Sequence, residues 1–442
     1  MTDRPESQIW TPDRHAVRVG VALSVALVYL TLRLRGVGLF TLVGDVTMLL
    51  TYPAAVLLGG VAVLWLLSRR PLRLYLQTTR FYVIAVAFTV WIALGGVGGP
   101  DPLRSLTLVG IHGMALLLLL GVSTFVRDRA TLALCNRFVY GVGALLAVVG
   151  LAWYLAVLAP WIPAAEPFGV DADNWAVIYM ETNGSLLRYT GFVGDPNFYP
   201  YYASLSPFCG LVPANYRNTL NIVGLGALQV TILLAMSRTF FGTTAAAIAA
   251  VAVLYAFART ERVGDDARLR FFALLSGLSL SALAAVAARY PAAAAEWVNR
   301  RLFGALLRDK RFTETWPTLL DGIVAQPILG HGSRSVETML GQTAHSAIFG
   351  LWYDFGLVGL LLWLALWTYT TRATLAVSLR STRLALPWLL ALLVSMGMNV
   401  MNSFQYDLFL WLLFGVAVAP GLLTDTSDQP TDGADARAPS GR

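Results

Sequence analysis

Residues 106–126 read LTLVGIHGMALLLLLGVSTFV, which is 21 residues without one Asp, Glu, Lys or Arg. A helix needs about 20 such residues to cross the hydrocarbon core of a bilayer. Similar runs recur along the chain, since 57% of its 442 residues are apolar and only 13% are charged, against roughly 25% charged in an ordinary soluble domain. This composition excludes a disordered chain and a typical cytosolic enzyme. It predicts an all-α protein whose main solvent is the bilayer.

The apolar runs predict a polytopic transmembrane bundle of about twelve spans. These spans lie near residues 16–34, 46–67, 80–98, 106–126, 137–159, 192–213, 219–236, 240–258, 271–289, 347–371, 384–401 and 404–422. We expect one membrane domain over residues 16–422. Residues 1–15 are polar and read as a cytoplasmic N-terminus before an uncleaved first helix, and residues 423–442 read as a disordered cytoplasmic tail.

Basic residues predict the orientation of the bundle. With the N-terminus in the cytoplasm, 20 of the 32 Lys and Arg residues fall on the cytoplasmic side, as the positive-inside rule expects. The net charge of +7 is thereby explained as loop charge, without a nucleic-acid partner. This orientation puts both long connections, 160–190 and 290–346, on the outer face, where loops of such length usually have a function.

The larger outer loop is expected to carry short amphipathic helices. A helical pattern over residues 291–311 gathers basic side chains within one arc; they are Arg300, Arg301, Arg308 and Arg311. Such a helix lies at the bilayer surface with its basic face toward anions, either lipid headgroups or a substrate. Trp316-Pro317 predicts a second short helix that stops before Pro327. A flexible turn, residues 330–334, follows it.

Two further outer-face motifs contain polar residues that could carry chemistry. Arg238, in Ser237-Arg238-Thr239, sits in a turn between two apolar runs, where it either snorkels to the headgroups or binds an anion. By position alone, snorkelling is the more common outcome. Asp195, in Gly191-Phe-Val-Gly-Asp-Pro-Asn197, has a structural interpretation as the cap of a helix that starts at Pro196.

Histidines supply the candidate bases. His345 lies two residues before the predicted span at 347–371, where the positive end of the helix dipole favours the neutral imidazole that a general base requires. The more ordinary interpretation of a single interfacial histidine is a polar anchor. His331 is the other outer-face histidine. The sequence has no CxxC or HExxH pattern and no clustered outer carboxylates, so we expect no metal and no other cofactor.

Taken in order, these motifs resemble the O-antigen ligase and O-antigen polymerase superfamily of bacterial envelope glycosyltransferases. The resemblance covers about residues 185–365. Its pieces are Arg188 to Asn197, Ser237-Arg238-Thr239, Trp316 through Gln326-Pro-Ile-Leu-Gly-His-Gly332, and Ala344-His345-Ser346 running into Tyr353-Asp-Phe-Gly-Leu-Val-Gly359. Each motif is weak by itself, but four in the right order on one predicted face are moderately specific.

The resemblance implies a glycosyltransferase in the bacterial inner membrane, with its active site on the periplasmic face. The donor would be a polyprenyl-diphosphate-linked glycan and the acceptor a hydroxyl of a lipid, glycan or protein. Arg238 and a loop arginine, with Arg188 as a further candidate, would hold the diphosphate in place of a metal, and His345 would be the general base. Asp195, Asn197 and His331 would support the site. The motifs do not separate a ligase from a polymerase.

Two positions depart from the family pattern. The family usually has Asn after the histidine, where this chain has Ser346. Its loop arginine lies four residues before the Trp, where this chain has Phe312, so Arg311 is one position off and Arg308 is the alternative. The competing class is a transporter or flippase of a lipid-linked glycan, which would place functional polar groups near mid-membrane.

Overall fold

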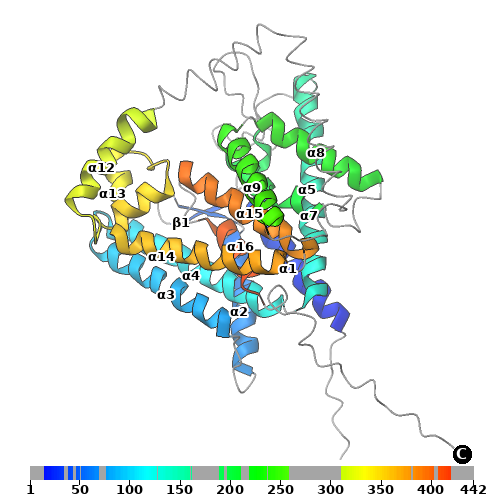
Figure 1. Cartoon of the computed structure of the whole chain (residues 1–442), viewed down its shortest axis with the longest axis horizontal. Coiled ribbons are helices and arrows are strands. Elements are labelled where there is room, and N and C mark those ends of the chain that lie inside the picture. Colours follow the sequence, from blue (N-terminus) through cyan, green and yellow to red (C-terminus); the bar gives the residue numbers. More distant parts are fainter. Residues whose placement is uncertain are drawn as a thin grey trace, which may run out of the picture.

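The computed structural model describes residues 14–33, 38–42, 46–49, 51–68, 76–126, 128–159, 161, 189–193, 197–210, 219–235, 237–257, 310–379, 382–402 and 407–419. Apart from one antiparallel pair of short strands, the described segments are helical (Figure 1). In chain order the elements are α1 (Arg14–Arg33), β1 (Gly38–Leu42), β2 (Val46–Leu49), α2 (Thr51–Ser68), α3 (Leu76–Val97), α4 (Pro102–Phe125), α5 (Arg129–Leu158), the 3₁₀ turn η1 (Gly191–Val193), α6 (Phe198–Ala203), α7 (Leu205–Gly210), α8 (Thr219–Ala235), α9 (Arg238–Phe257), the π-helical turn η3 (Arg311–Thr315), α12 (Trp316–Ala325), α13 (Ser335–Leu340), α14 (Ala347–Ser378), α15 (Thr382–Met401) and α16 (Leu408–Ala417).

Six of these helices are long and apolar enough to cross a membrane: α1, α3, α4, α5, α14 and α15. They coincide with six of the predicted spans. Four shorter apolar helices, α2, α8, α9 and α16, fall within four more. The chain is therefore an α-helical membrane protein, and the total of twelve spans stays a prediction. The predicted span at 271–289 and almost all of the amphipathic helix at 291–311 lie outside the described residues.

The predicted continuous span at 192–213 is wrong. Its described part is divided into η1, α6 and α7, with Ser204 between the last two helices. Pro200 and Pro207 fall inside this stretch, and a proline cannot donate the backbone hydrogen bond that a helix interior needs. The break is buried, so neighbouring side chains bond its backbone: the Tyr29 hydroxyl donates to the Tyr202 carbonyl at 2.9 Å.

Two other predicted boundaries differ from the structure. The helix expected at 46–67 begins only at Thr51, because Val46–Leu49 pairs with Gly38–Leu42 as a hairpin. The helix expected at 347–371 continues to Ser378. Both differences arise where an apolar run alone does not specify the helix end.

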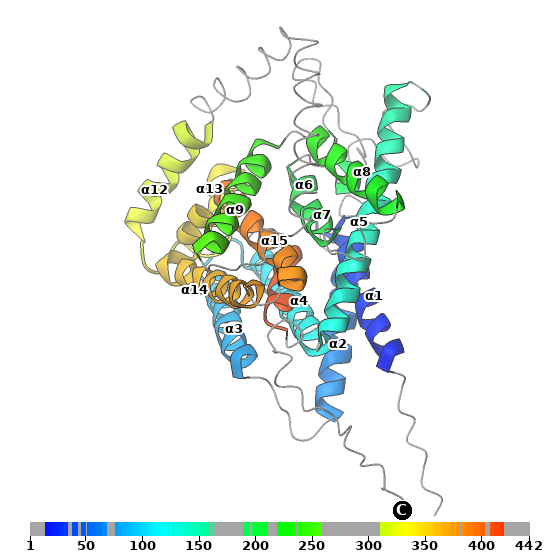
Figure 2. The same cartoon turned by 45° about the vertical axis from the view of Figure 1, so that its right-hand side comes forward.

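Helix α16 forms the centre of the bundle. All ten of its residues are buried, as expected for a helix that is apolar on every side. Its aromatic side chains pack edge to face with those of other helices; Phe414 meets Phe81 of α3 at 5.9 Å and Trp367 of α14 at 5.2 Å between ring centroids. This packing joins the N-terminal and C-terminal spans into one body (Figures 1 and 2).

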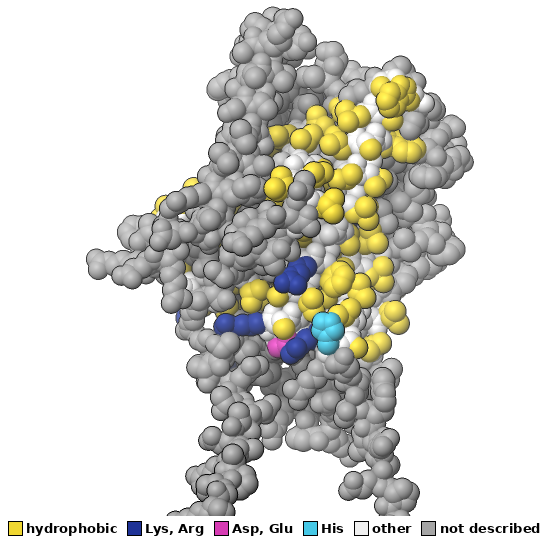
Figure 3. Space-filling view, turned by 90° about the vertical axis from the view of Figure 1, so that its right-hand side faces the viewer, with side chains coloured by type: hydrophobic (Ala, Val, Ile, Leu, Met, Phe, Trp, Pro, Cys, Tyr) yellow, Lys and Arg dark blue, Asp and Glu magenta, His cyan; other side chains and the backbone are white. Residues whose placement is uncertain are grey.

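One face of the bundle is largely apolar among its described residues. On the side of α5 and α8, apolar side chains cover much of the described surface, and basic and histidine side chains gather at its lower end (Figure 3). At one end of the bundle the Arg18 guanidinium of α1 forms an ion pair of 2.9 Å with Asp128, in the turn before α5. The start of α1 and the α4–α5 turn therefore share one side of the membrane, in agreement with the predicted alternation.

Helices α12 and α13 lie beside the start of α14, on the opposite side of the molecule from α1 and α5 (Figure 2). The chain between α12 and α14 also contacts the end of α3, where the backbone N–H of Ser333 donates to the Gly95 carbonyl at 3.0 Å. This cluster at the ends of α3, α14 and α15 contains the residues that the sequence singled out in the larger outer loop.

Candidate functional site

Arg311 is held against the end of α15. It opens the π-helical turn η3, and its Nη1 donates to the carbonyl of Met401 at 3.1 Å. The last carbonyls of a helix have no partner within it and carry the negative end of its dipole, so a guanidinium is stabilised there. Arg311 thus has a structural role in capping α15.

His345 lies next to the same helix end. The backbone N–H of Ala347, two residues after it, donates to the carbonyl of Asn402 at 3.1 Å. Ser346 between them is the N-cap of α14, and its hydroxyl accepts the N–H of Phe349. His345 is half-buried and has a φ of 51°, a left-handed conformation in which histidine is enriched among residues other than glycine. The predicted position of His345, two residues before a helix, is confirmed.

The indole of Trp316 connects these two segments. Its Nε1 donates to the carbonyl of Ala344 at 3.2 Å, and its ring packs between Phe312 and Phe349, with centroid distances of 4.6 Å and 5.0 Å. Because Trp316 follows η3 directly, the indole links the arginine segment to the histidine segment. The structure therefore brings the chain segments that contain Arg311 and His345 together near residues 401 and 402.

The short helix that Trp316-Pro317 predicted is confirmed. α12 begins at Trp316 with Pro317 in its first turn and ends at Ala325, two residues before Pro327. Leu319 and Ile323 bury one side of it against Val336 and Tyr353. The helix thus positions η3 and Arg311 relative to α14.

His331 has structural contacts. Its Nε2 lies 2.8 Å from the Gly322 carbonyl, and its ring stacks on Tyr353 at 4.3 Å between centroids. A carbonyl oxygen only accepts hydrogen bonds, so Nε2 carries the proton and Nδ1 is the nitrogen that could accept one. The turn expected to be flexible is instead bonded to α14 through its backbone, as the N–H of Gly332 donates to the Asp354 carbonyl at 2.8 Å.

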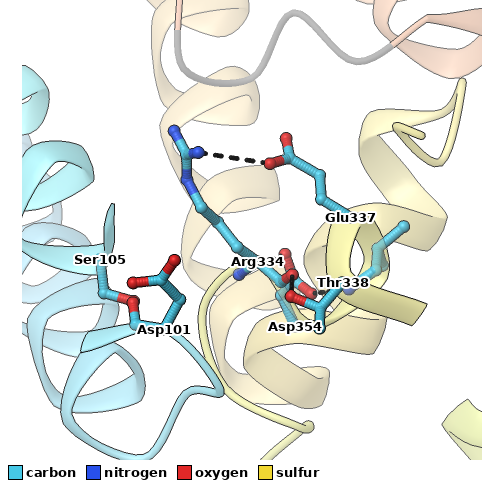
Figure 4. Close-up of polar contacts among 7 residues, drawn as sticks. Asp101, Ser105, Arg334, Glu337, Thr338 and Asp354 are labelled. Atoms are coloured by element: carbon cyan, nitrogen blue, oxygen red, sulfur yellow. Dashed lines mark hydrogen bonds and ion pairs between the residues drawn. The ribbon is translucent and has the colours of Figure 1, made fainter. Parts of the chain in front are cut away.

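Asp354 is a buried acid to which the sequence assigned no role. Its carboxylate accepts the backbone N–H groups of Arg334, at 3.2 Å, and Val336, at 3.0 Å, and so caps α13 from the neighbouring helix α14. The Arg334 side chain extends between Asp101 and Glu337 and forms an ion pair of 3.4 Å with Glu337 (Figure 4). The Tyr-Asp-Phe-Gly motif was the only signal that marked this position, and the capping bonds explain why an acid belongs there.

The motif around Asp195 is described in part. Asn197 lies directly before α6, which begins at Phe198 rather than at Pro196 as predicted. Arg188, Asp195 and Pro196 lie outside the described residues. One described residue of the motif, Tyr189, packs on Tyr199, which lies just after the motif and contacts a buried cation.

Arg33, at the last position of α1, is the functional candidate that sequence reasoning missed. Its side chain is only 2% exposed. Its guanidinium lies 4.9 Å from the ring centroid of Tyr199, and Nη1 donates to the Tyr29 hydroxyl at 3.1 Å. Tyr189 packs edge to face on Tyr199 at 4.8 Å. Among the described residues Arg33 has no carboxylate partner, so the tyrosines provide its contacts through cation–π and hydroxyl interactions.

Arg238 is at the start of α9. The turn before it is short, as predicted, because α8 ends at Ala235. Ser237 occupies a capping position, with its hydroxyl accepting the N–H of Phe240 at 3.4 Å. The side chain of Arg238, like Arg308 as a whole, lies outside the described residues. Its predicted contact with a diphosphate stays a prediction.

No group of three or more His, Cys, Asp or Glu side chains that could hold a metal occurs in the described part of the chain. Comparisons of the sequence with the known protein families and with curated proteins find no match. The fold and the apolar surface define the class as an α-helical membrane protein, and the function rests on the site itself.

Proposed function

We propose that the protein is a metal-independent, inverting membrane glycosyltransferase of the O-antigen ligase or polymerase type. It transfers a glycan from a polyprenyl-diphosphate carrier to an acceptor hydroxyl at the outer face of the bacterial inner membrane. The single observation that carries this proposal is that the segments of Arg311 and His345 meet at the end of α15. There the Arg311 guanidinium donates to the Met401 carbonyl, and the backbone N–H of Ala347, two residues after His345, donates to the Asn402 carbonyl. The order of the sequence motifs supports the assignment to this family.

The chemistry requires one cation and one base close together. The acceptor oxygen attacks the anomeric carbon and its proton passes to the imidazole of His345. The bond between that carbon and the phosphate oxygen breaks, and the diphosphate leaves with the electron pair. Arg311 stabilises the negative charge that develops on the leaving group, a role in which bidentate guanidinium contacts replace a metal.

The N-cap arrangement at Ser346 supports His345 as the base. His345 lies next to the start of α14, which is the positive end of the helix dipole. This end of the dipole disfavours a positively charged imidazole there. The left-handed backbone of His345 costs free energy of order 1 kcal/mol and persists only when the surroundings fix it. Such strain occurs often at functional positions.

The test is transfer by the purified full-length protein in vesicles that contain a polyprenyl-diphosphate glycan and an acceptor. We expect His345→Gln to reduce transfer by roughly 10²- to 10⁴-fold, the usual range for a general base, while donor binding persists. Gln342→Ala, at an exposed neighbouring position, is the matched control and should transfer normally. A His345→Gln protein with a normal rate would remove His345 from the mechanism.

Arg311 needs a test that separates binding from capping. Arg311→Lys keeps one donor for the Met401 carbonyl but cannot reproduce bidentate contacts to a diphosphate. We expect lower transfer with an unchanged thermal midpoint, whereas Lys310→Ala, at the exposed adjacent residue, should alter neither. Loss of stability together with activity would leave Arg311 with the capping role alone.

A donor that crosses the bilayer without cleavage of its glycan would support the transporter class instead.

A further inference from the structure

The chain that follows α12 turns back along α14 and exposes apolar side chains at its tip. Val324, near the end of α12, is 78% exposed, and Ile328 and Leu329 in the turn are 60% and 66% exposed. We call residues 324–329 the α12 tip. Three large apolar side chains at the end of one hairpin are unfavourable in water, because each burial from water is worth about 1.5–3 kcal/mol.

Two carbonyl groups of the same segment, those of Pro327 and Ile328, accept hydrogen bonds from α14, and the turn that follows donates two more to it. Gly356 interrupts α14 with a φ of 65°. Around this kink, backbone N–H and C=O groups of α14 form hydrogen bonds with the turn at residues 327–332. The bonds are His331 N to Tyr353 O (2.9 Å), Gly332 N to Asp354 O (2.8 Å), Leu357 N to Pro327 O (2.9 Å) and Val358 N to Ile328 O (3.5 Å). Glycines permit this close approach, since an added Cβ at Gly356 would overlap the Ile328 carbonyl.

The α12 tip lies beside α14 at a point well along that helix from its start. Gly356 is nine residues beyond Ala347, which is about 14 Å along a helix at 1.5 Å per residue. α14 is itself long and apolar enough to cross a membrane, and the tip lies alongside the first third of this helix. On another side of the kink, the indole of Trp91 in α3 donates to the Phe355 carbonyl at 2.9 Å.

Irregular structure is tolerated in hydrocarbon where its backbone polar groups are bonded within the protein. In the tip, the carbonyls of Gln326, Pro327 and Ile328 accept backbone hydrogen bonds and Pro327 has no N–H, while the apolar side chains are exposed. The apolar surface also continues from the tip onto α14, where Leu357 is 38% and Leu361 54% exposed. We propose that the α12 tip is a re-entrant segment, immersed in the leaflet on the His345 side of the membrane and covered there by lipid acyl chains.

The experiment measures which quencher reaches the tip. Ile328→Cys and, separately, Leu329→Cys are labelled with a bimane fluorophore in the full-length protein in phosphatidylcholine vesicles. Both native cysteines are buried, and the unmodified protein gives the background. We expect nitroxide lipids labelled along the acyl chain to quench both probes several-fold more strongly than iodide does.

Thr318→Cys is the matched control, because Thr318 is exposed in the first half of the same helix, toward the start of α14. It should be quenched mainly by iodide. Iodide quenching of the tip probes equal to that at Thr318 would show that the tip lies in water and would overturn the proposal. Protection of the tip from both quenchers would also overturn it, because a protein surface, such as a second copy of the chain, would then cover the tip.

Discussion

Ser346 determines how the chain enters α14 and therefore where His345 lies. Its hydroxyl caps the helix at the N–H of Phe349, and Ser and Asn are both among the preferred N-cap residues. The departure from the family pattern at this position thus retains the capping function. The structural reason for a polar residue here is independent of any contact with substrate.

We expect Ser346→Asn to retain transfer activity and stability. Ser346→Ala removes the cap and should lower the free energy of unfolding by about 1 kcal/mol. It should also reduce transfer, because the left-handed conformation of His345 is fixed by the residues that follow it. Thermal unfolding and transfer assays on both variants test this. Full activity in Ser346→Ala would show that the cap does not position the histidine.

Asp128 gives a pH-dependent test of the packing at the opposite end of the bundle. Partial burial acts to raise the pKa of Asp128, but hydrogen bonds from Thr131 and Arg18 outweigh it, so the pKa lies below its usual value of 3.8. A lowered pKa stabilises the folded protein above about pH 3.8, and this contribution disappears as the pH falls through the lower, folded-state pKa.

Asp128→Asn should therefore lower the thermal midpoint near neutral pH, and the difference from the unmodified protein should shrink below about pH 3.8 and vanish only below the lower, folded-state pKa. Asp321→Asn, at an exposed position on α12, should show no such dependence. A difference that persists unchanged in acid would mean that the Asn variant loses packing rather than charge.

Arg33 illustrates what an analysis by apolar runs overlooks. An arginine at the end of a span is ordinarily a snorkelling anchor, and residue spacing does not reveal that two tyrosines from a distant segment join Tyr29 of the same helix around it. Tyr189 and Tyr199 come from the motif near Asp195, whereas Tyr29 comes from α1. The cluster exists only in the folded chain.

At the scale of elements, α12 was predictable and the kink in α14 was not. Tryptophan followed by proline marks a helix start and the later proline marks a stop, and both signals are local. The kink at Gly356 depends on the turn at 327–332, which supplies partners for the released backbone groups. A glycine inside an apolar run carries no local sign of such a partner.

Gly356→Ala tests this pairing. A side chain there would adopt a positive φ and overlap the Ile328 carbonyl, so we expect the free energy of unfolding to fall by about 1–3 kcal/mol. Gly98→Ala is the control, because an added Cβ at Gly98 meets no atom within 4 Å. Equal thermal midpoints for the two variants would contradict the tight pairing of turn and kink.

At the scale of the molecule, the distribution of basic residues predicts that α13 lies outside the cell membrane and the α4–α5 turn inside. Cysteines at Glu337, which is half-buried, and at Ala130, which is exposed, test this with a membrane-impermeant thiol reagent on intact cells. We expect labelling at residue 337 and none at residue 130. The reverse pattern would invert the orientation and move the candidate site to the cytoplasm.

The contacts at the end of α15 also set an order of assembly during biosynthesis. Arg311 and the residue after Ser346 both bond carbonyls at positions 401 and 402, which leave the ribosome after the entire loop and α14. A nascent chain therefore carries the arginine and the histidine on the membrane surface before their common support exists. The arrangement at the end of α15 can form only after α15 has been made, so under the proposed function a partly synthesised chain would not transfer glycan.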